Sequence, residues 1–124
     1  MAPTPDLSGL RVLVLEDEML VSMLIEDMLT EQHCVIVGPF AAVSEALVAA
    51  RAEAFDFAVL DVNVGGVKAY PVAETLAARG IPFVFLSGYG QSAMPPDRPD
   101  WRVCSKPFRD EQLVEIIAQQ LARR

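Results

Sequence analysis

Acidic residues that could bind a metal or attack phosphorus directly follow two short apolar runs of this sequence. Glu16 and Asp17 come after Arg11–Leu15, and Asp61 comes after Phe57–Leu60. Carboxylate oxygens are the ligands that Mg²⁺ prefers, and a carboxylate can also act as a covalent nucleophile. These residues therefore indicate magnesium and phosphoryl chemistry, provided that the fold brings them together.

Two more residues of this kind follow later apolar runs. Ser87 comes after Pro82–Leu86, and Lys106 comes shortly after Arg102–Cys104. A hydroxyl can donate a hydrogen bond to a phosphoryl oxygen, and an ammonium can neutralise its charge. Asn63 adds a backbone carbonyl to the possible metal ligands.

The elements that must position these residues alternate regularly. The apolar runs have the length of strands, and a further short strand is predicted over Val35–Gly38. Segments with helical spacing separate them: Met19–Gln32, Ser44–Glu53, Ala69–Arg79 and Asp110–Leu121. This alternation predicts a parallel sheet covered by helices on both faces. In such sheets ligands bind at the carboxyl ends of the strands, which is where the polar residues lie.

Length, composition and charge limit the possible functions. The 124 residues fit one domain. We expect it over residues 10–124, after a loose leader over residues 1–9 that lacks the features of a secretory signal. No apolar run reaches membrane-spanning length, and the net charge of −7 repels nucleic acid and anionic lipid. We therefore expect a cytoplasmic protein that binds neither nucleic acid nor membranes.

The cysteines and the histidine do not indicate a second catalytic site. Cys34 and Cys104 lie in or beside predicted strands and form no CxxC pair, so we expect buried, reduced thiols. His33 is the only histidine and falls at a helix end, where exposure is the default. A histidine-based catalytic triad therefore has little support.

The ordered set of Glu16–Asp17, Asp61, Ser87 and Lys106–Pro107–Phe108 resembles the response regulator receiver family, from about Leu10 to Leu121. The resemblance implies an α/β, flavodoxin-like (CheY-like) fold, a doubly wound five-stranded parallel sheet of order 2-1-3-4-5. It implies a single-domain response regulator of a two-component system or phosphorelay. Its phosphoryl donor would be a histidine kinase or histidine phosphotransfer protein.

The resemblance also assigns roles to the residues. Asp61 is the expected phosphoacceptor, with Lys106 and Ser87 at the phosphoryl group. The expected Mg²⁺ ligands are Glu16, Asp17, Asp61 and the backbone carbonyl of Asn63. The chain would be no enzyme, except that it catalyses its own phosphorylation and dephosphorylation. The implied strand order also puts Cys34 and Cys104 at opposite sheet edges, too far apart for a disulfide.

Two stretches depart from the common pattern of the family. Residues 62–66 lack the proline that usually follows the phosphoacceptor, which predicts a freer loop. The family's aromatic switch residue usually lies three positions before the lysine, but Val103 stands there. Residues 81–90 are similar to a subgroup frequent in alphaproteobacteria, with Pro-Phe and then Thr/Ser-Gly-Tyr. Tyr89 is therefore the expected substitute switch, together with Ser87.

The segment Gln91–Asp100 contains Pro95, Pro96 and Pro99. Each proline removes an amide donor and restrains the preceding residue, so the fourth helix of the family should be shortened or missing. That change alters a surface that many receivers use for dimers. We expect a monomer or a weak dimer.

Met19, Leu20 and Met23 remain as spare apolar residues once Leu24 is assigned, with Val21, Ile25 and Met28, to the inward face of the first helix. Such a patch predicts partner docking, and the alternative is ordinary scattered surface residues. We expect no effector after the last helix, and therefore output through a downstream protein or by passing the phosphoryl group on.

Two other classes of function are possible. A receiver-like interaction module would act without phosphorylation, but the complete set of Asp17, Asp61 and Lys106 argues against it. A hydrolase of the haloacid dehalogenase type would place its nucleophile after the first strand and would need a cap domain. Here the first predicted strand is followed by Glu16, Asp17 and Glu18, whereas the expected nucleophile Asp61 follows the third, and we expect no cap domain.

Overall fold

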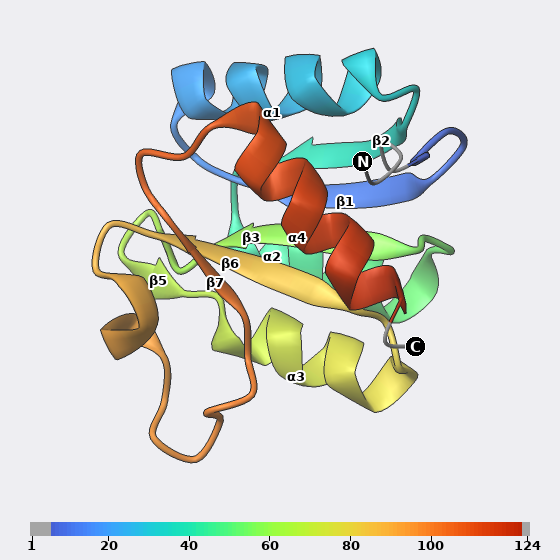
Figure 1. Ribbon diagram of the computed structural model, residues 1–124. Helices are drawn as coiled ribbons and strands as arrows, with labels where there is room; N and C mark the ends of the chain where they lie inside the picture. Colours follow the sequence, from blue (N-terminus) through green and yellow to red (C-terminus); the bar gives the residue numbers. More distant parts are fainter. Residues whose placement is uncertain (1–5, 123–124) are drawn as a thin grey trace.

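A computed structural model describes residues 6–122 as a central sheet of five parallel strands (Figure 1). The strands are β1 (Arg11–Leu15), β2 (Val35–Phe40), β3 (Phe57–Asp61), β6 (Phe83–Ser87) and β7 (Val103–Ser105). Their spatial order is β2-β1-β3-β6-β7. The predicted order 2-1-3-4-5, and with it the doubly wound fold, is therefore confirmed.

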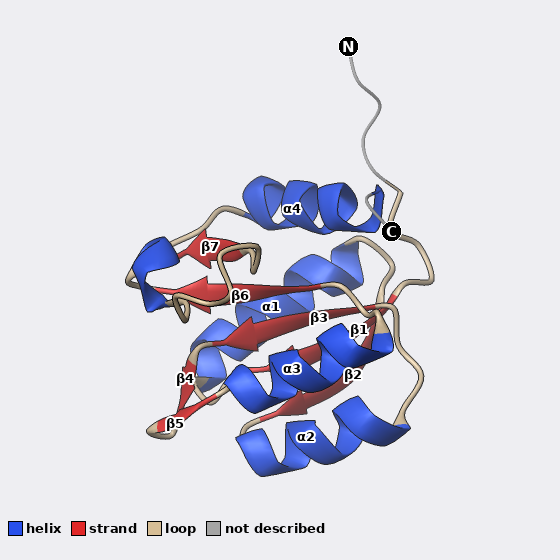
Figure 2. Ribbon diagram, turned by 90° about the horizontal axis from the view of Figure 1, so that it is seen from below, coloured by secondary structure: helices blue, strands red, loops and turns tan. Residues whose placement is uncertain are grey.

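Helices cover both faces of this sheet. They are α1 (Met19–Glu31), α2 (Val43–Ala52), α3 (Tyr70–Arg79) and α4 (Asp110–Ala122). α1 and α4 lie on one face, and α2 and α3 lie on the other (Figures 1 and 2). Because strand side chains alternate between faces, Val12 and Val14 pack in the core under α1 and α4, whereas Leu13 and Leu15 pack under α2 and α3.

The inward face of α1 differs from the predicted one at Leu24. We placed this residue with Ile25 and Met28, but 64% of Leu24 is exposed. Ser22 and Leu29 are buried instead. A small polar residue thus occupies an inward position, where a hydropathy pattern does not reveal it. Leu24 joins the exposed apolar residues of α1.

The segment after Asp61 is more ordered than we predicted. Instead of a free loop it forms an antiparallel hairpin of β4 (Asn63–Val64) and β5 (Val67–Lys68). Gly65 and Gly66, between the two strands, have φ angles of 57° and 83°. Type I′ turns require positive φ at both central positions, and two glycines satisfy that requirement without strain. The Gly-Gly pair therefore defines a hairpin.

Between β6 and β7 the structure has a single turn of 3₁₀ helix, η1 (Gly90–Ala93). This is the position where the sequence predicts that a regular helix of the family is shortened or missing. Beyond it, the chain returns to β7 without regular structure. Trp101 anchors this segment by packing on Phe83 and Phe85, at 5.6 and 5.7 Å between ring centroids. Arg98 adds two hydrogen bonds to the carboxylate of Glu74 on α3. Aromatic packing and one ion pair thus replace helical packing here.

The expected loose leader is wrong for its last residues. Leu7 is buried in the core, and its carbonyl accepts a hydrogen bond from Cys34 Sγ at 3.6 Å. Residues 1–5 of that leader lie outside the described residues. Cys34 and Cys104 are buried and free, as predicted. Among residues 6–122, no helix combines the length and the apolar character needed to cross a membrane.

Candidate functional site

The predicted polar residues meet at one edge of the sheet, where the parallel strands end. The strand arrows in Figure 2 point toward this edge. Glu16 directly follows β1, while Asp61 and Ser87 are the last residues of β3 and β6. Lys106 follows β7, and its backbone N–H donates to the Ser87 carbonyl at 2.8 Å. Strand register thus fixes the relative positions of these side chains.

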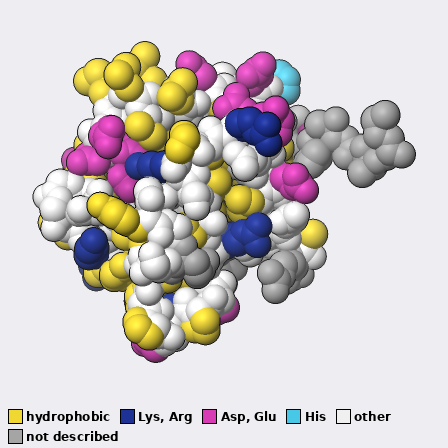
Figure 3. Space-filling model, turned by 60° about the vertical axis from the view of Figure 1, so that its left-hand side comes forward, with side chains coloured by type: hydrophobic (Ala, Val, Ile, Leu, Met, Phe, Trp, Pro, Cys, Tyr) yellow, Lys and Arg dark blue, Asp and Glu magenta, His cyan; other side chains and the backbone are white. Residues whose placement is uncertain are grey.

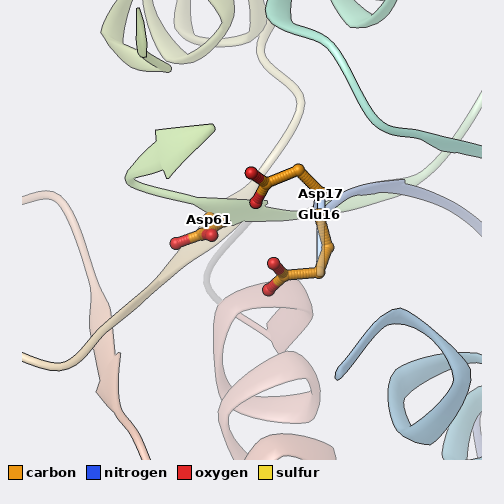
Figure 4. Close-up of side chains that lie close together, drawn as sticks. All are labelled: Glu16, Asp17 and Asp61. Atoms are coloured by element: carbon orange, nitrogen blue, oxygen red, sulfur yellow. The ribbon is translucent and has the colours of Figure 1, made fainter. Parts of the chain in front are cut away.

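Three carboxylates from two strand ends form the centre of the site. Oxygen atoms of Glu16, Asp17 and Asp61 lie within 4.8 Å of one another, and Figure 4 shows the three groups turned toward the same side. Glu16 and Asp61 are buried, and Asp17 is exposed. Like charges this close repel each other unless a cation lies among them. Oxygen donors of this type fit Mg²⁺, and access from solvent past Asp17 suits an ion that retains water ligands.

The pKa of Glu16 reflects both its burial and its acidic neighbour Asp61. Burial raises the pKa of Glu16 to about 7. The neighbouring Asp61 carboxylate acts in the same direction, while the Glu18 N–H and Lys106 favour the ionised form. The Glu18 N–H donates to Glu16 Oε2 at 3.1 Å. Without a bound cation, the ionised carboxylates of Glu16 and Asp61 therefore repel each other, and the Glu18 N–H and Lys106 offset part of this repulsion.

Lys106 is the cation in contact with this acidic group. Its Nζ lies 3.3 Å from Glu16 Oε1 and 3.5 Å from Asp61 Oδ1. Burial alone would lower the pKa of Lys106, but the carboxylates of Asp61 and Glu16 outweigh it, and the pKa is raised above its ordinary value. Lys106 therefore stays charged beside Asp61.

The β4–β5 hairpin closes the site on another side. The Gly65 N–H donates to Asp17 Oδ2 at 2.9 Å, which ties the hairpin tip to Asp17. The Ala69 N–H donates to the Val62 carbonyl at 2.9 Å. In an antiparallel ladder, hydrogen-bonded and non-hydrogen-bonded pairs alternate, so the next pair, Asn63 with Lys68, is a non-hydrogen-bonded one. The Asn63 carbonyl therefore accepts no hydrogen bond from β5 and remains available to a metal ion.

Ser87 connects the site to η1. The Ser87 side chain is buried, and its Oγ accepts a hydrogen bond from the Tyr89 N–H at 2.9 Å. A hydroxyl can accept and donate at the same time, so the Ser87 proton remains available to an incoming oxygen. The Tyr89 carbonyl in turn accepts from Ser92 Oγ at 2.6 Å. The Tyr89 ring points outward, with 84% of the residue exposed.

A model of the response regulator receiver domain matches residues 12–118. The chain belongs to this family. No curated protein matches the sequence significantly.

Solved structures place this receiver among known ones. SdrG from Pseudomonas melonis Fr1, in its BeF3-activated conformation, is 39% identical with a TM-score of 0.76, covering 92% of this chain and 98% of that one. The response regulator PhyR from Brucella abortus is 25% identical, with a TM-score of 0.79 over 93% of this chain. The receiver spans only 49% of the PhyR chain, about half its length.

A more distant structure shares the fold alone. The receiver domain of the sensor histidine kinase PA1611 from Pseudomonas aeruginosa PAO1 is 21% identical, with a TM-score of 0.76. The match covers 93% of this chain and 99% of that one. That structure is described with a magnesium ion coordinated in its active site cleft.

An open pocket of about 370 Å³ lies beside Asp61 in this receiver. Its polar lining residues are Asp61, Asn63, Lys68, Ser87, Tyr89 and Ser92. Lys68 was not among the predicted site residues, because only the β4–β5 hairpin brings it to this edge. Recognition of Gly65–Gly66 as a hairpin turn would have indicated it.

The predicted docking residues are exposed at the start of α1. Met19, Leu20 and Met23 are exposed by 76%, 76% and 51%, and Leu24 adds to them. These four residues form the α1 patch, which contributes to the yellow surface over α1 at the top of Figure 3. α1 begins two residues after Asp17, so the patch adjoins the acidic site.

Mg²⁺ at millimolar concentration should stabilise this receiver by about 1–3 kcal/mol, a rise of several degrees in Tm, because it binds the folded carboxylates. Asp17→Asn should raise the metal-free Tm by relieving repulsion and should abolish most of the Mg²⁺ effect. Asparagine retains an oxygen acceptor for the Gly65 N–H. Circular dichroism melts with EDTA or Mg²⁺ measure both effects.

The matched control is Asp27→Asn, which removes an exposed carboxylate of α1. This variant should keep the full Mg²⁺ response. Equal Mg²⁺ responses in the wild type and Asp17→Asn would exclude the site.

Proposed function

We propose that this receiver acts as a single-domain response regulator that accepts a phosphoryl group on Asp61. One observation supports this most directly: Asp61 lies at a strand end with Lys106 Nζ at 3.5 Å and two further carboxylates beside it. A nucleophile, a countercation and a set of metal ligands thus share one edge. In this proposal the protein is no enzyme, beyond catalysing its own phosphorylation and dephosphorylation.

Each residue has a part in the transfer. An Asp61 oxygen forms a bond to phosphorus, while the bond to the donor's leaving group breaks and the leaving group keeps the electron pair. Lys106 would move from its carboxylate partners toward the phosphoryl oxygens, and the Ser87 hydroxyl would donate to one of them. Mg²⁺, held by Glu16, Asp17, Asp61 and the Asn63 carbonyl, would neutralise charge on the oxygens involved.

Incubation with Mg²⁺ and acetyl phosphate should add the mass of one phosphoryl group to the wild type. Asp61→Asn should remove this adduct, because an amide is no nucleophile toward phosphorus. Lys106→Ala should slow its formation by about two orders of magnitude, since it removes the countercation beside Asp61. Intact-mass spectrometry over time measures all three proteins.

Asp56→Asn is the control, since Asp56 lies where β3 begins, at the opposite edge of the sheet. It should be phosphorylated like the wild type. Full adduct formation by Asp61→Asn would disprove the assignment. A wild type that gains no mass but binds its partners would instead support an interaction module.

The proposed donor is a histidine kinase or histidine phosphotransfer protein that docks on the α1 patch. The patch adjoins the acidic site, so a protein seated there would bring its phosphohistidine close to Asp61. A downstream protein would recognise the phosphorylated form. The response regulator role of the family supports both kinds of partner.

Met23→Glu should reduce phosphotransfer from the cognate donor at least about tenfold, because a buried charge at an apolar interface is costly. Phosphorylation by acetyl phosphate should not change. Val48→Glu is the matched control, since Val48 is exposed on α2, across the sheet from α1. Transfer to Met23→Glu at the wild-type rate would exclude this docking surface.

We further infer that Ser87 and Tyr89 form the switch, in place of a strand aromatic. The similarities to SdrG and PhyR support a place in the alphaproteobacterial subgroup with Ser/Thr-Gly-Tyr at this strand end. The hydrogen bond from the Tyr89 N–H to Ser87 Oγ provides a direct connection. Movement of Ser87 toward a phosphoryl group would pull the backbone that leads into η1.

Beryllofluoride should shift the amide signals of residues 91–100 in the wild type, because η1 follows Ser87. Tyr89→Ala should reduce these shifts if the ring stabilises the moved backbone. Two-dimensional amide spectra with and without beryllofluoride measure the effect. As the control for binding, the Ser87 amide signal should shift on addition of beryllofluoride by the same amount in both proteins. Identical shifts over residues 91–100 in both proteins would remove Tyr89 from the switch.

A further inference from the structure

The pocket beside Asp61 contains a cation that the proposed reaction does not use. Lys68 and Lys106 are the only lysines in the sequence, and both border the site. Lys106 is paired with Glu16 and Asp61. The Lys68 ammonium has neither an ion pair nor a hydrogen bond within residues 6–122. It is therefore available to an anion that enters the pocket.

The hairpin fixes the position of Lys68. Asn63 and Lys68 are cross-strand partners, and they form the non-hydrogen-bonded kind of pair, in which side chains lie closest. Both residues line the pocket. The hydrogen bond from the Gly65 N–H to Asp17 holds the hairpin tip against the acidic site. Lys68 is thus carried by a backbone tied to the proposed metal ligands.

The direction of attack assigns a place to the leaving group. In phosphoryl transfer the nucleophile and the leaving group lie roughly in line on opposite sides of phosphorus. With Asp61 as nucleophile, the leaving group would lie on the far side of phosphorus, in the pocket that Lys68 and Ser92 also line. Lys106 lies on the Glu16 side of Asp61 and does not line this pocket.

We propose that Lys68 binds the anionic leaving group of a small acyl phosphate and makes carboxylic acyl phosphates preferred phosphodonors. This inference rests on the proposed phosphorylation of Asp61. As the Asp61 oxygen bonds to phosphorus, the bond between phosphorus and the acyl oxygen breaks, and a carboxylate leaves with the electron pair. The Lys68 ammonium stabilises this developing charge, which the net charge of −7 would otherwise repel.

The choice of phosphodonor tests the assignment. Acetyl phosphate releases acetate, whereas phosphoramidate releases ammonia, which carries no negative charge for Lys68 to bind. Both transfer the same phosphoryl group to Asp61. An interaction with the leaving group must therefore affect acetyl phosphate alone, while an interaction with the phosphoryl oxygens must affect both donors.

Intact-mass time courses with Mg²⁺ and either donor give the half-saturating donor concentration and the limiting rate. Lys68→Gln should raise the half-saturating concentration of acetyl phosphate about fivefold, the effect of one partly exposed charge pair. That of phosphoramidate should stay within about twofold, and Lys68→Arg should restore the wild-type value because it keeps the charge. Added salt should reduce the difference between wild type and Lys68→Gln.

Arg51→Gln provides the matched control, because it removes one positive charge from the last turn of α2, just before β3 begins at the opposite edge of the sheet. It should behave like the wild type with both donors. Circular dichroism confirms that each variant is folded.

The outcomes separate the two proposals. A wild type that gains no phosphoryl group overturns the proposed function and this inference with it. A phosphorylated wild type with Lys68→Gln unchanged overturns this inference alone. Equal losses with acetyl phosphate and phosphoramidate overturn the assignment of Lys68 to the leaving group.

Discussion

The repulsion among Glu16, Asp17 and Asp61 is the constraint on which the site depends. Their oxygens lie within 4.8 Å of one another at the end of a buried sheet, and water screens the buried Glu16 and Asp61 poorly. The Lys106 ammonium and the N–H groups of Glu18 and Gly65 offset part of this repulsion. A divalent cation would offset the rest, so metal binding and the stability of this edge are coupled.

The fold maintains this arrangement through its central strands. β1 and β3 are almost entirely buried, so their backbones have little freedom to separate when the carboxylates repel. The segments beyond the strand ends are irregular, and a few polar contacts hold them: Gly65 to Asp17, Tyr89 to Ser87, and Arg98 to Glu74. The rigid part thus positions the charges, and the weakly held part can respond to them.

The sequence predicts most of this site because strand ends are local features. Apolar runs identify the strands, and the next polar residue of each run, such as Asp61, then lies at the shared edge. The absence of a regular helix between β6 and β7 is likewise predictable from local sequence, since Pro95, Pro96 and Pro99 exclude it directly. Both predictions need only the sequence order and the chemistry of single residues.

The features that were missed depend on pairing between segments. Lys68 reaches the pocket only because the turn at Gly65–Gly66 pairs β4 with β5 in one register. The packing of α1 buries Ser22 and leaves Leu24 exposed, whereas hydropathy alone predicts the opposite. Such outcomes follow from tertiary contacts, which single-residue patterns do not encode.

Charge also explains how a signal could leave this edge. Before transfer, Lys106 Nζ contacts Glu16 and Asp61, and its backbone N–H is bonded to the Ser87 carbonyl. A phosphoryl group on Asp61 would move negative charge outward from the carboxylate, so Lys106 and the Ser87 hydroxyl would both follow it.

Because the hydrogen bond from the Lys106 N–H to the Ser87 carbonyl joins β6 and β7 where both strands end, these two ends would move together. η1 and the segment that Trp101 anchors run from the end of β6 to the start of β7, so this connection is the part of the structure that would respond first.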